Sequence, residues 1–184
     1  MPEFESSRKL CDFAGNIGYF SFAFMQANEN LRAHIYDLPE VCDLAWKLKK
    51  DQPHFDRSTF HDFDMEKDTS FGSGYDLFFS SHFLYELNAD NRLLDFFNQV
   101  NQAMIPGGLF ISNHIVPPED NAPHLTFAIV ELLTRCMGYP THRLPEQDII
   151  TALSNAGFGK FTTKRIETEF TYPILLLSAV KIRD

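Results

Sequence analysis

A glycine-rich turn followed at a set distance by an acid constrains this chain more than any other feature. The turn spans residues 12–18, begins with Asp12 and contains Gly15 and Gly18. Asp37 ends the next apolar segment, 19 residues after Gly18. A glycine turn lets a ligand approach the backbone, and an acid accepts hydrogen bonds from ribose hydroxyls. The pair therefore predicts a nucleoside site at the edge of an α/β sheet.

Apolar segments and turn residues predict strands and helices that alternate along the chain. We expect strands near residues 8–13, 32–36, 56–61, 75–80, 109–112, 158–166 and 170–182. We expect helices near 17–28, from Pro39 to about Lys50, and near 89–103, 123–137 and 145–155, with a loop over 117–121. This alternation predicts an α/β fold, in which a mostly parallel sheet carries helices on both faces, within one domain over residues 1–184. The last two strands have only a short polar connection, which predicts an antiparallel hairpin.

Two helices carry a more specific prediction about burial. Val41, Leu44, Ala45 and Leu48 follow the spacing of an amphipathic helix, so this stripe should face the sheet. The segment 123–137 is apolar nearly all round, which predicts a helix that is buried or lines a pocket.

Charge and composition exclude several classes of partner. The formal net charge of −9 argues against a nucleic acid or an anionic membrane as partner. No apolar run approaches the roughly 20 residues of a membrane span. The acidic first residues do not resemble a signal peptide. Seven histidines show no metal-ligand spacing, so we expect no metal site.

The three cysteines indicate where the protein works. Cys11, Cys42 and Cys136 are widely spaced and odd in number, so they form neither a disulfide framework nor a zinc pattern. Buried thiols of this kind are typical of a reducing compartment. We therefore expect a cytoplasmic protein.

Polar residues at the strand ends are the candidates for chemistry, because ligands bind at the carboxyl ends of parallel strands. Besides the glycine turn and Asp37, they are Asp62 with Phe63, and the Ser80–His82 segment that leads to Tyr85 and Glu86. Asp62 is expected to accept a hydrogen bond from an adenine amine while Phe63 packs on the ring. A turn role is the alternative for Asp62.

Five stretches together resemble an S-adenosylmethionine-dependent methyltransferase. They are Asp12-x-x-Gly15-x-x-Gly18, residues 36–41 with the Asp-Leu-Pro-Glu-Val box, His61–Phe63, Ile105–Gly108 and Ala156–Phe158. The chain is similar in particular to the catalytic domain of small-molecule O-methyltransferases of the caffeic acid and acetylserotonin type. The resemblance covers nearly the whole chain.

The resemblance implies a class I fold, a Rossmann-like three-layer sandwich whose seven-stranded sheet has an antiparallel last strand. It also implies S-adenosylmethionine as cofactor. Gly15 and Gly18, beside Asp12, would face the amino-acid part of the cofactor, and Asp37 would bind the ribose. Leu38 would lie beside the adenine, with Asp62 and Phe63 on the other side of the ring. Ser80, at the end of its strand, completes the cofactor-binding set.

The chain departs from the family pattern at functional positions. Ala14 and Asn16 stand where the family has glycines, and Tyr85 stands where it has the histidine that removes the acceptor's proton. The supporting glutamate matches Asn113. A tyrosine with a pKa of about 10 is a poor base at neutral pH. Tyr85 and the nearby His82 are the catalytic candidates, and His114 is a further histidine near these positions.

The resemblance also implies an N-terminal helical region. We expect that region to be missing here, because the sequence begins about eight residues before the first strand. The chain would then be either a fragment or truncated gene product, or a catalytic domain that works alone. The apolar surface that normally meets that region should then be exposed, with 123–137 as the candidate, which predicts self-association into a homo-oligomer.

Three functional readings remain open. The leading one is methyl transfer to a small organic acceptor. The second is a cofactor-binding but catalytically inactive domain with an assembly or regulatory role. The third is an NAD-dependent oxidoreductase. The Asp-Leu-Pro box and the terminal hairpin are evidence against this third reading.

Overall fold

A seven-stranded sheet organises the molecule in the computed structural model, which describes residues 2–65, 67–87, 92–116, 125–138, 144–166 and 173–183. The strand order is β3-β2-β1-β4-β5-β7-β6. The strands are β1 (Lys9–Phe13), β2 (Arg32–Asp37), β3 (Ser58–Asp62), β4 (Tyr75–Ser81), β5 (Met104–Ile115), β6 (Phe158–Ile166) and β7 (Ile174–Lys181). Strands β1 to β5 pair in parallel, whereas β7 runs antiparallel to both β5 and β6. The predicted parallel sheet and terminal hairpin are confirmed.

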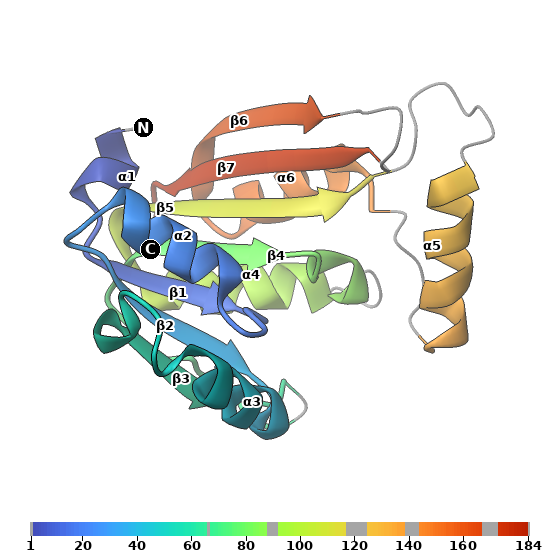
Figure 1. Cartoon of the computed structure of the whole chain (residues 1–184). Coiled ribbons are helices and arrows are strands. Elements are labelled where there is room, and N and C mark those ends of the chain that lie inside the picture. Colours follow the sequence, from blue (N-terminus) through green and yellow to red (C-terminus); the bar gives the residue numbers. More distant parts are fainter. Residues whose placement is uncertain are drawn as a thin grey trace.

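Helices cover both faces of this sheet (Figure 1). They are α2 (Tyr19–Ala27) and α3 (Pro39–Lys49) on one face, and α4 (Arg92–Ala103) and α6 (Glu146–Asn155) on the other. A short α1 (Pro2–Ser6), the 3-10 helices η1 (Phe55–Arg57) and η2 (Leu84–Leu87), and α5 (Leu125–Cys136) complete the described elements. The α/β three-layer architecture is therefore confirmed.

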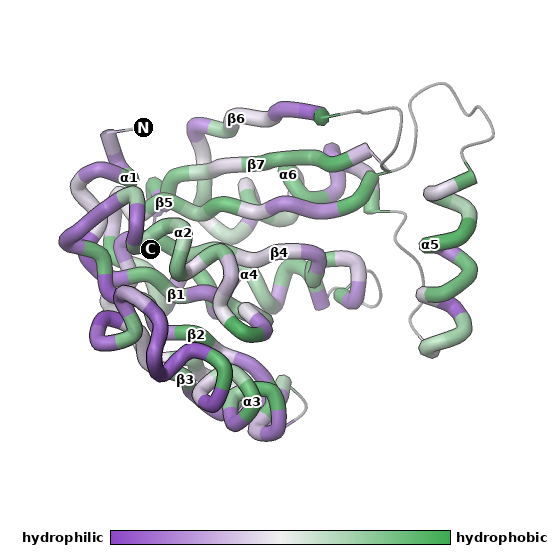
Figure 2. The backbone as a smooth tube through the Cα atoms, viewed as in Figure 1, coloured by the Kyte–Doolittle hydropathy of each residue, from purple (hydrophilic) through white to green (hydrophobic). Residues whose placement is uncertain are grey.

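The two faces of the sheet bury different side chains, because neighbouring residues of a strand point to opposite faces. Leu10 packs with Met25 and Ile35 beneath α2. Cys11 belongs to a larger, phenylalanine-rich cluster on the other face. Figure 2 shows the central strands as mostly hydrophobic, as a strand covered on both faces requires.

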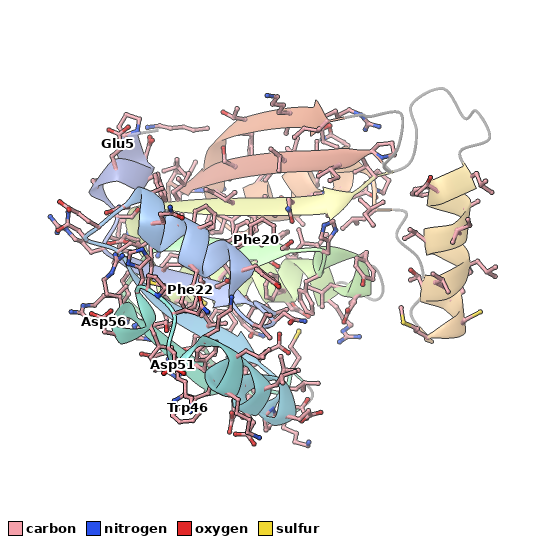
Figure 3. All side chains as sticks on the ribbon, in the orientation of Figure 1. Glu5, Phe20, Phe22, Trp46, Asp51 and Asp56 are labelled. Atoms are coloured by element: carbon pink, nitrogen blue, oxygen red, sulfur yellow. The ribbon has the colours of Figure 1, made fainter. Side chains whose placement is uncertain are left out.

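The predicted buried stripe of α3 is wrong at two positions. Leu44 and Leu48 are 50% and 53% exposed, whereas Cys42 and Ala45 are buried. Small side chains at 42 and 45 let the helix lie close to the sheet, and the Cys42 Sγ reaches the backbone oxygens of Asp37 and His61 at 3.4 and 3.2 Å. Trp46, labelled in Figure 3, is also exposed.

The prediction that the helix at 123–137 is buried is also wrong. Within α5 only Phe127 and Thr134 are buried. Its exposed apolar side chains, with Met137 just after it, are Leu125 at 76%, Ile129 at 48%, Leu132 at 62%, Leu133 at 55% and Met137 at 65%. In Figure 1 the helix stands apart from the sheet, beyond the end where the parallel strands finish. The alternative expectation, an exposed apolar surface on this segment, agrees with the structure.

Some element boundaries differ from the prediction. Strand β5 begins directly after α4, at Met104 rather than at residue 109, with a register shift against β4 between Tyr75 and Leu77. Helix α2 begins at Tyr19 because Gly18 takes a left-handed φ of 79° before it. The predicted loop at 117–121, and the start of the predicted strand at 170–182, lie outside the described residues.

Candidate functional site

A cavity of about 880 Å³ opens where β1, β2 and β4 end. Strand order reverses between β1 and β4, and such a switch point is where open α/β sheets bind ligands. The described residues that line the cavity are Asp12, Phe13, Ala14, Gly15, Asn16, Tyr19, Phe20, Tyr36, Asp37, Leu38, Phe63, Asp64, Met65, Ser81, His82, Phe83, Glu86, Leu87, Arg92 and Gly138. Aromatic walls with a few charged groups suit a flat, polar-edged ligand.

The glycine turn forms one wall and holds unusual backbone angles. Ala14 and Asn16, which stand in place of family glycines, have φ values of 54° and 51°. A left-handed φ raises the conformational free energy of alanine more than that of asparagine. A Cβ at Gly15 would lie 2.8 Å from both the Asp12 Cγ and the Ile35 Cγ2 atom, so this position requires glycine.

Asp37 is fixed at the end of β2 by two backbone N–H groups. The Asn16 N–H donates to its Oδ2 at 2.8 Å, and the Leu38 N–H donates to its Oδ1 at 2.9 Å. The carboxylate is half-buried and borders the cavity. Each oxygen keeps a free lone pair beside these bonds, so the group can accept hydrogen bonds from a diol in a fixed orientation.

Asp12 is buried at the end of β1 and is only partly satisfied. The Ser21 hydroxyl donates to its Oδ2 at 2.6 Å, while its Oδ1 has no hydrogen-bond partner among the described residues. Burial raises the pKa of Asp12 to about 7, the hydrogen bond from Ser21 opposes this shift, and the charge of Asp37 adds to it. A buried acid with an unsatisfied oxygen at a cavity wall is suited to a cationic group of a ligand.

The structure places the sequence-predicted residues unevenly. Six of the ten line the cavity, namely Asp12, Gly15, Asp37, Leu38, Phe63 and His82. The other four are Gly18, Asp62, Ser80 and Tyr85, which are absent from the described lining. Asp62 is exposed, whereas Ser80 and Tyr85 are buried. Gly18 packs against Ile35, because a Cβ at Gly18 would lie 2.8 Å from the Ile35 Cδ1 atom.

Beyond β3 the cavity wall is built by the next residues along the chain. The Phe63 N–H donates to the Asp37 backbone oxygen at 2.8 Å, which extends the β2–β3 pairing past Asp62. Asp64 and Met65 then reach the cavity. Asp64 could not be ranked above Asp62 from the sequence, because the direction of a side chain beyond the end of β3 depends on the backbone path.

The end of β4 supplies the remaining polar wall. His82 lines the cavity in a left-handed conformation, φ 53°, and its N–H donates to the Asn113 backbone oxygen at 2.8 Å. Glu86 and Arg92 line the same wall. Glu86 belongs to the polar segment predicted after this strand, where it had no assigned role, and Arg92 was not a candidate from the sequence. Glu86 lies in η2, soon after the end of β4, and this position was the available signal, whereas Arg92 is the first residue of α4 and carried no such signal.

His114 lies outside this wall. It is 1% exposed, and it does not line the cavity as the described residues form it. Burial, with a smaller effect from the charge of His82, lowers the pKa of His114 to about 4, so its imidazole is neutral at physiological pH.

Within the described part of the chain, no three His, Cys, Asp or Glu side chains gather as metal ligands do. None of the helices there is long and apolar enough to cross a bilayer.

Comparison with known proteins assigns the family. A family model for an O-methyltransferase domain matches residues 1–159. The chain belongs to this family. Its members use S-adenosylmethionine as the methyl donor, and the resemblance inferred from the sequence is confirmed.

Related proteins agree with the fold. Human N-acetylserotonin methyltransferase in complex with S-adenosylmethionine superposes with a TM-score of 0.74 and 22% identity, over 96% of this chain and 48% of that one. PigF with S-adenosylhomocysteine superposes with a TM-score of 0.78 and 21% identity, over 97% of this chain and 51% of that one. An uncharacterized protein of Methanocaldococcus jannaschii is 31% identical over 118 residues, 64% of this chain and 30% of the relative. The chain thus spans about half the length of these solved structures and less of that relative.

Proposed function

We propose that this domain binds S-adenosylmethionine in the cavity and transfers its methyl group to a small organic acceptor, most simply to an oxygen. The observation that carries the proposal is the Asp37 carboxylate at the end of β2. Two N–H groups hold it beside a turn with no room for a Cβ at Gly15.

The residues present fit this cofactor. Asp37 would accept from the ribose hydroxyls, with Leu38 and Phe63 beside the adenine. The unsatisfied Oδ1 of Asp12 would face the cationic amino group, beside the backbone of Gly15. Gly18, Asp62 and Ser80 do not line the described cavity and remain proposed cofactor residues.

The cofactor supplies an electrophilic methyl group on a sulfonium when it is bound. The chain's own part is to position the acceptor, to exclude water with its aromatic walls and to remove a proton where the acceptor carries one. Tyr85 and His82 are the residues proposed from the sequence for this last role.

A catalytically inactive, cofactor-binding domain is the alternative, and one feature supports it. Tyr85 stands in place of the family histidine and is buried, 9% exposed, away from the described cavity lining.

Calorimetry with S-adenosylmethionine, S-adenosylhomocysteine and NAD tests cofactor choice. We expect both adenosyl ligands to bind and NAD not to bind; binding of NAD alone would overturn the proposal. Release of S-adenosylhomocysteine over a panel of phenols, enols and carboxylates then separates an active domain from an inactive one.

Self-association and location are further parts of the proposal. The exposed apolar residues of α5 support a homo-oligomer, because a contiguous apolar surface is typical of an interface. The free thiols of Cys11, Cys42 and Cys136 support a reducing, cytoplasmic location.

A further inference from the structure

We infer that Glu86 is the group that takes the proton from the methyl acceptor, and that the acceptor is a small molecule with an ionisable hydroxyl. This inference rests on the proposed methyl transfer and deepens it, because it names a catalytic residue and a substrate class.

The geometry of η2 selects Glu86 over its neighbour. In a 3-10 helix successive side chains are about 120° apart, so Tyr85 and Glu86 cannot face the same way. Leu84 and Tyr85 are buried, whereas Glu86 is half-buried and borders the cavity. The turn that follows β4 therefore presents a carboxylate to the ligand and keeps the phenol behind it.

Groups on several helices and strands surround Glu86 and shift the pKa of its carboxyl. Burial is the largest influence and raises the pKa of Glu86, and the charge of Asp37 at the end of β2 raises it further. Arg92 on α4 and a hydrogen bond from Tyr85 lower the pKa. A carboxylate whose pKa is raised by burial is a better base than a free one, and Tyr85 acts on it as a positioning residue.

His82 is the rival base, because it borders the same cavity. An imidazole that takes a proton becomes a cation, whereas the Glu86 carboxylate that takes a proton becomes neutral. The two candidates therefore leave different charges in the cavity, and substitution of each residue separates them.

The step balances without another reactant. The acceptor's O–H bond breaks and its proton moves to a Glu86 oxygen, while the oxygen's electron pair forms the new bond to the methyl carbon. The electrons of the broken carbon–sulfur bond stay on sulfur, which becomes a neutral thioether.

The first test uses phenols of graded acidity. With catechol, which is mostly neutral at pH 8, Glu86→Gln should reduce the rate of S-adenosylhomocysteine release about 100-fold. With 4-nitrophenol, which is mostly ionised at that pH, the reduction should be less than about threefold, because no base is needed. Glu29→Gln, an exposed site at the opposite end of β2, is the matched control and should change neither rate.

His82→Asn separates the two candidate bases, since asparagine tolerates the left-handed φ at this position. We expect a smaller loss with catechol than in Glu86→Gln. A larger loss in His82→Asn, or equal losses on both phenols in Glu86→Gln, would overturn the inference.

The second test needs no turnover. 4-Nitrophenol absorbs visibly when ionised, so its apparent pKa can be read while it is bound to the complex with S-adenosylhomocysteine. The Glu86 carboxylate should hold the phenol proton to a higher pH in the wild type than in Glu86→Gln. Equal values, or no binding of nitrophenol at millimolar concentration, would count against Glu86.

Calorimetry with S-adenosylhomocysteine distinguishes failure of the proposed function from failure of the Glu86 inference. Loss of this binding in the wild type would overturn the proposed function itself. Intact cofactor binding with no turnover of any phenol would overturn the Glu86 inference alone and favour the inactive domain.

Discussion

Ala14 adopts a strained backbone conformation in the glycine turn. Its φ of 54° lies in the left-handed region, where the Cβ of an L-residue crowds the following carbonyl oxygen. We expect Ala14→Gly to raise the free energy of unfolding by about 1 kcal/mol, measured by urea denaturation.

A matched substitution shows whether that gain is specific to the turn. Ala23 is exposed within α2, so Ala23→Gly should instead lower the free energy of unfolding by about 0.5–1 kcal/mol. Destabilisation by both glycines would mean that the methyl group of Ala14 contributes more through packing than its backbone costs.

Asp37 is expected to dominate cofactor affinity. Asp37→Ala removes the ribose acceptor and leaves the Asn16 and Leu38 N–H groups without their carboxylate, so the Kd for S-adenosylhomocysteine should rise about 100-fold by calorimetry. Asp43→Ala, an exposed site on α3, is the control and should bind normally. An unchanged Kd in Asp37→Ala would remove Asp37 from the site.

Asp12 should make folding stability depend on pH in an unusual direction. Its pKa of about 7 in the folded state exceeds the value of about 3.9 in the unfolded chain, so the folded state retains its proton longer. The free energy of unfolding should therefore fall as the pH rises from 4 to 7 and level off above that. The contribution is on the order of 4 kcal/mol.

Asp12→Asn removes this titration while it keeps the shape of the side chain. Relative to that variant, the wild type should lose stability across pH 4 to 7 in urea melts. Parallel stability curves for the two proteins would show that Asp12 does not carry the shifted pKa.

At the scale of elements, α3 shows how a correct helix can be assigned the wrong face. The buried positions are Cys42 and Ala45, and the larger Leu44 and Leu48 lie at the surface. Ala45→Leu should lower the free energy of unfolding by about 1–3 kcal/mol through overpacking. Leu48→Glu should change it by less than about 0.5 kcal/mol.

Circular dichroism and thermal melts of these two variants check the assignment. If Leu48→Glu lowered the free energy of unfolding strongly while Ala45→Leu left it unchanged, the buried face of α3 would be the one expected from the sequence. Periodicity alone could not decide this, because both faces of α3 carry apolar residues and only the closeness of the sheet favours the smaller ones.

At the scale of the whole molecule, α5 is an apolar helix that the described chain leaves uncovered. Figure 2 shows it as largely hydrophobic, and Leu132 and Leu133 are both more than half exposed. We expect light scattering to show a mass that grows with protein concentration, and the pair Leu132→Glu and Leu133→Glu to abolish that growth.

Leu44→Glu on α3 is the control for added charge, since Leu44 is similarly exposed on another helix. A sharp monomer at high concentration in the wild type would contradict the proposed self-association. Equal effects of the α3 and α5 variants would show that charge, and not the α5 surface, controls solubility.

The sequence by itself determined the order of strands and helices, the closing hairpin, the glycine turn and the acid at Asp37. These are local patterns, in which periodicity, turn residues and spacing along the chain carry the information. Family motifs added the sheet topology and the cofactor class.

Only the tertiary structure decided which side chains meet in the cavity. It brings Asp64, Glu86 and Arg92 to the wall, and it leaves Asp62 exposed and Tyr85 buried outside the lining. The reason is physical: past the end of a strand, side-chain direction follows from backbone pairing and turn geometry. The glycine turn and Asp37 could be assigned without such information, because the residue types and their spacing along the chain indicated their role.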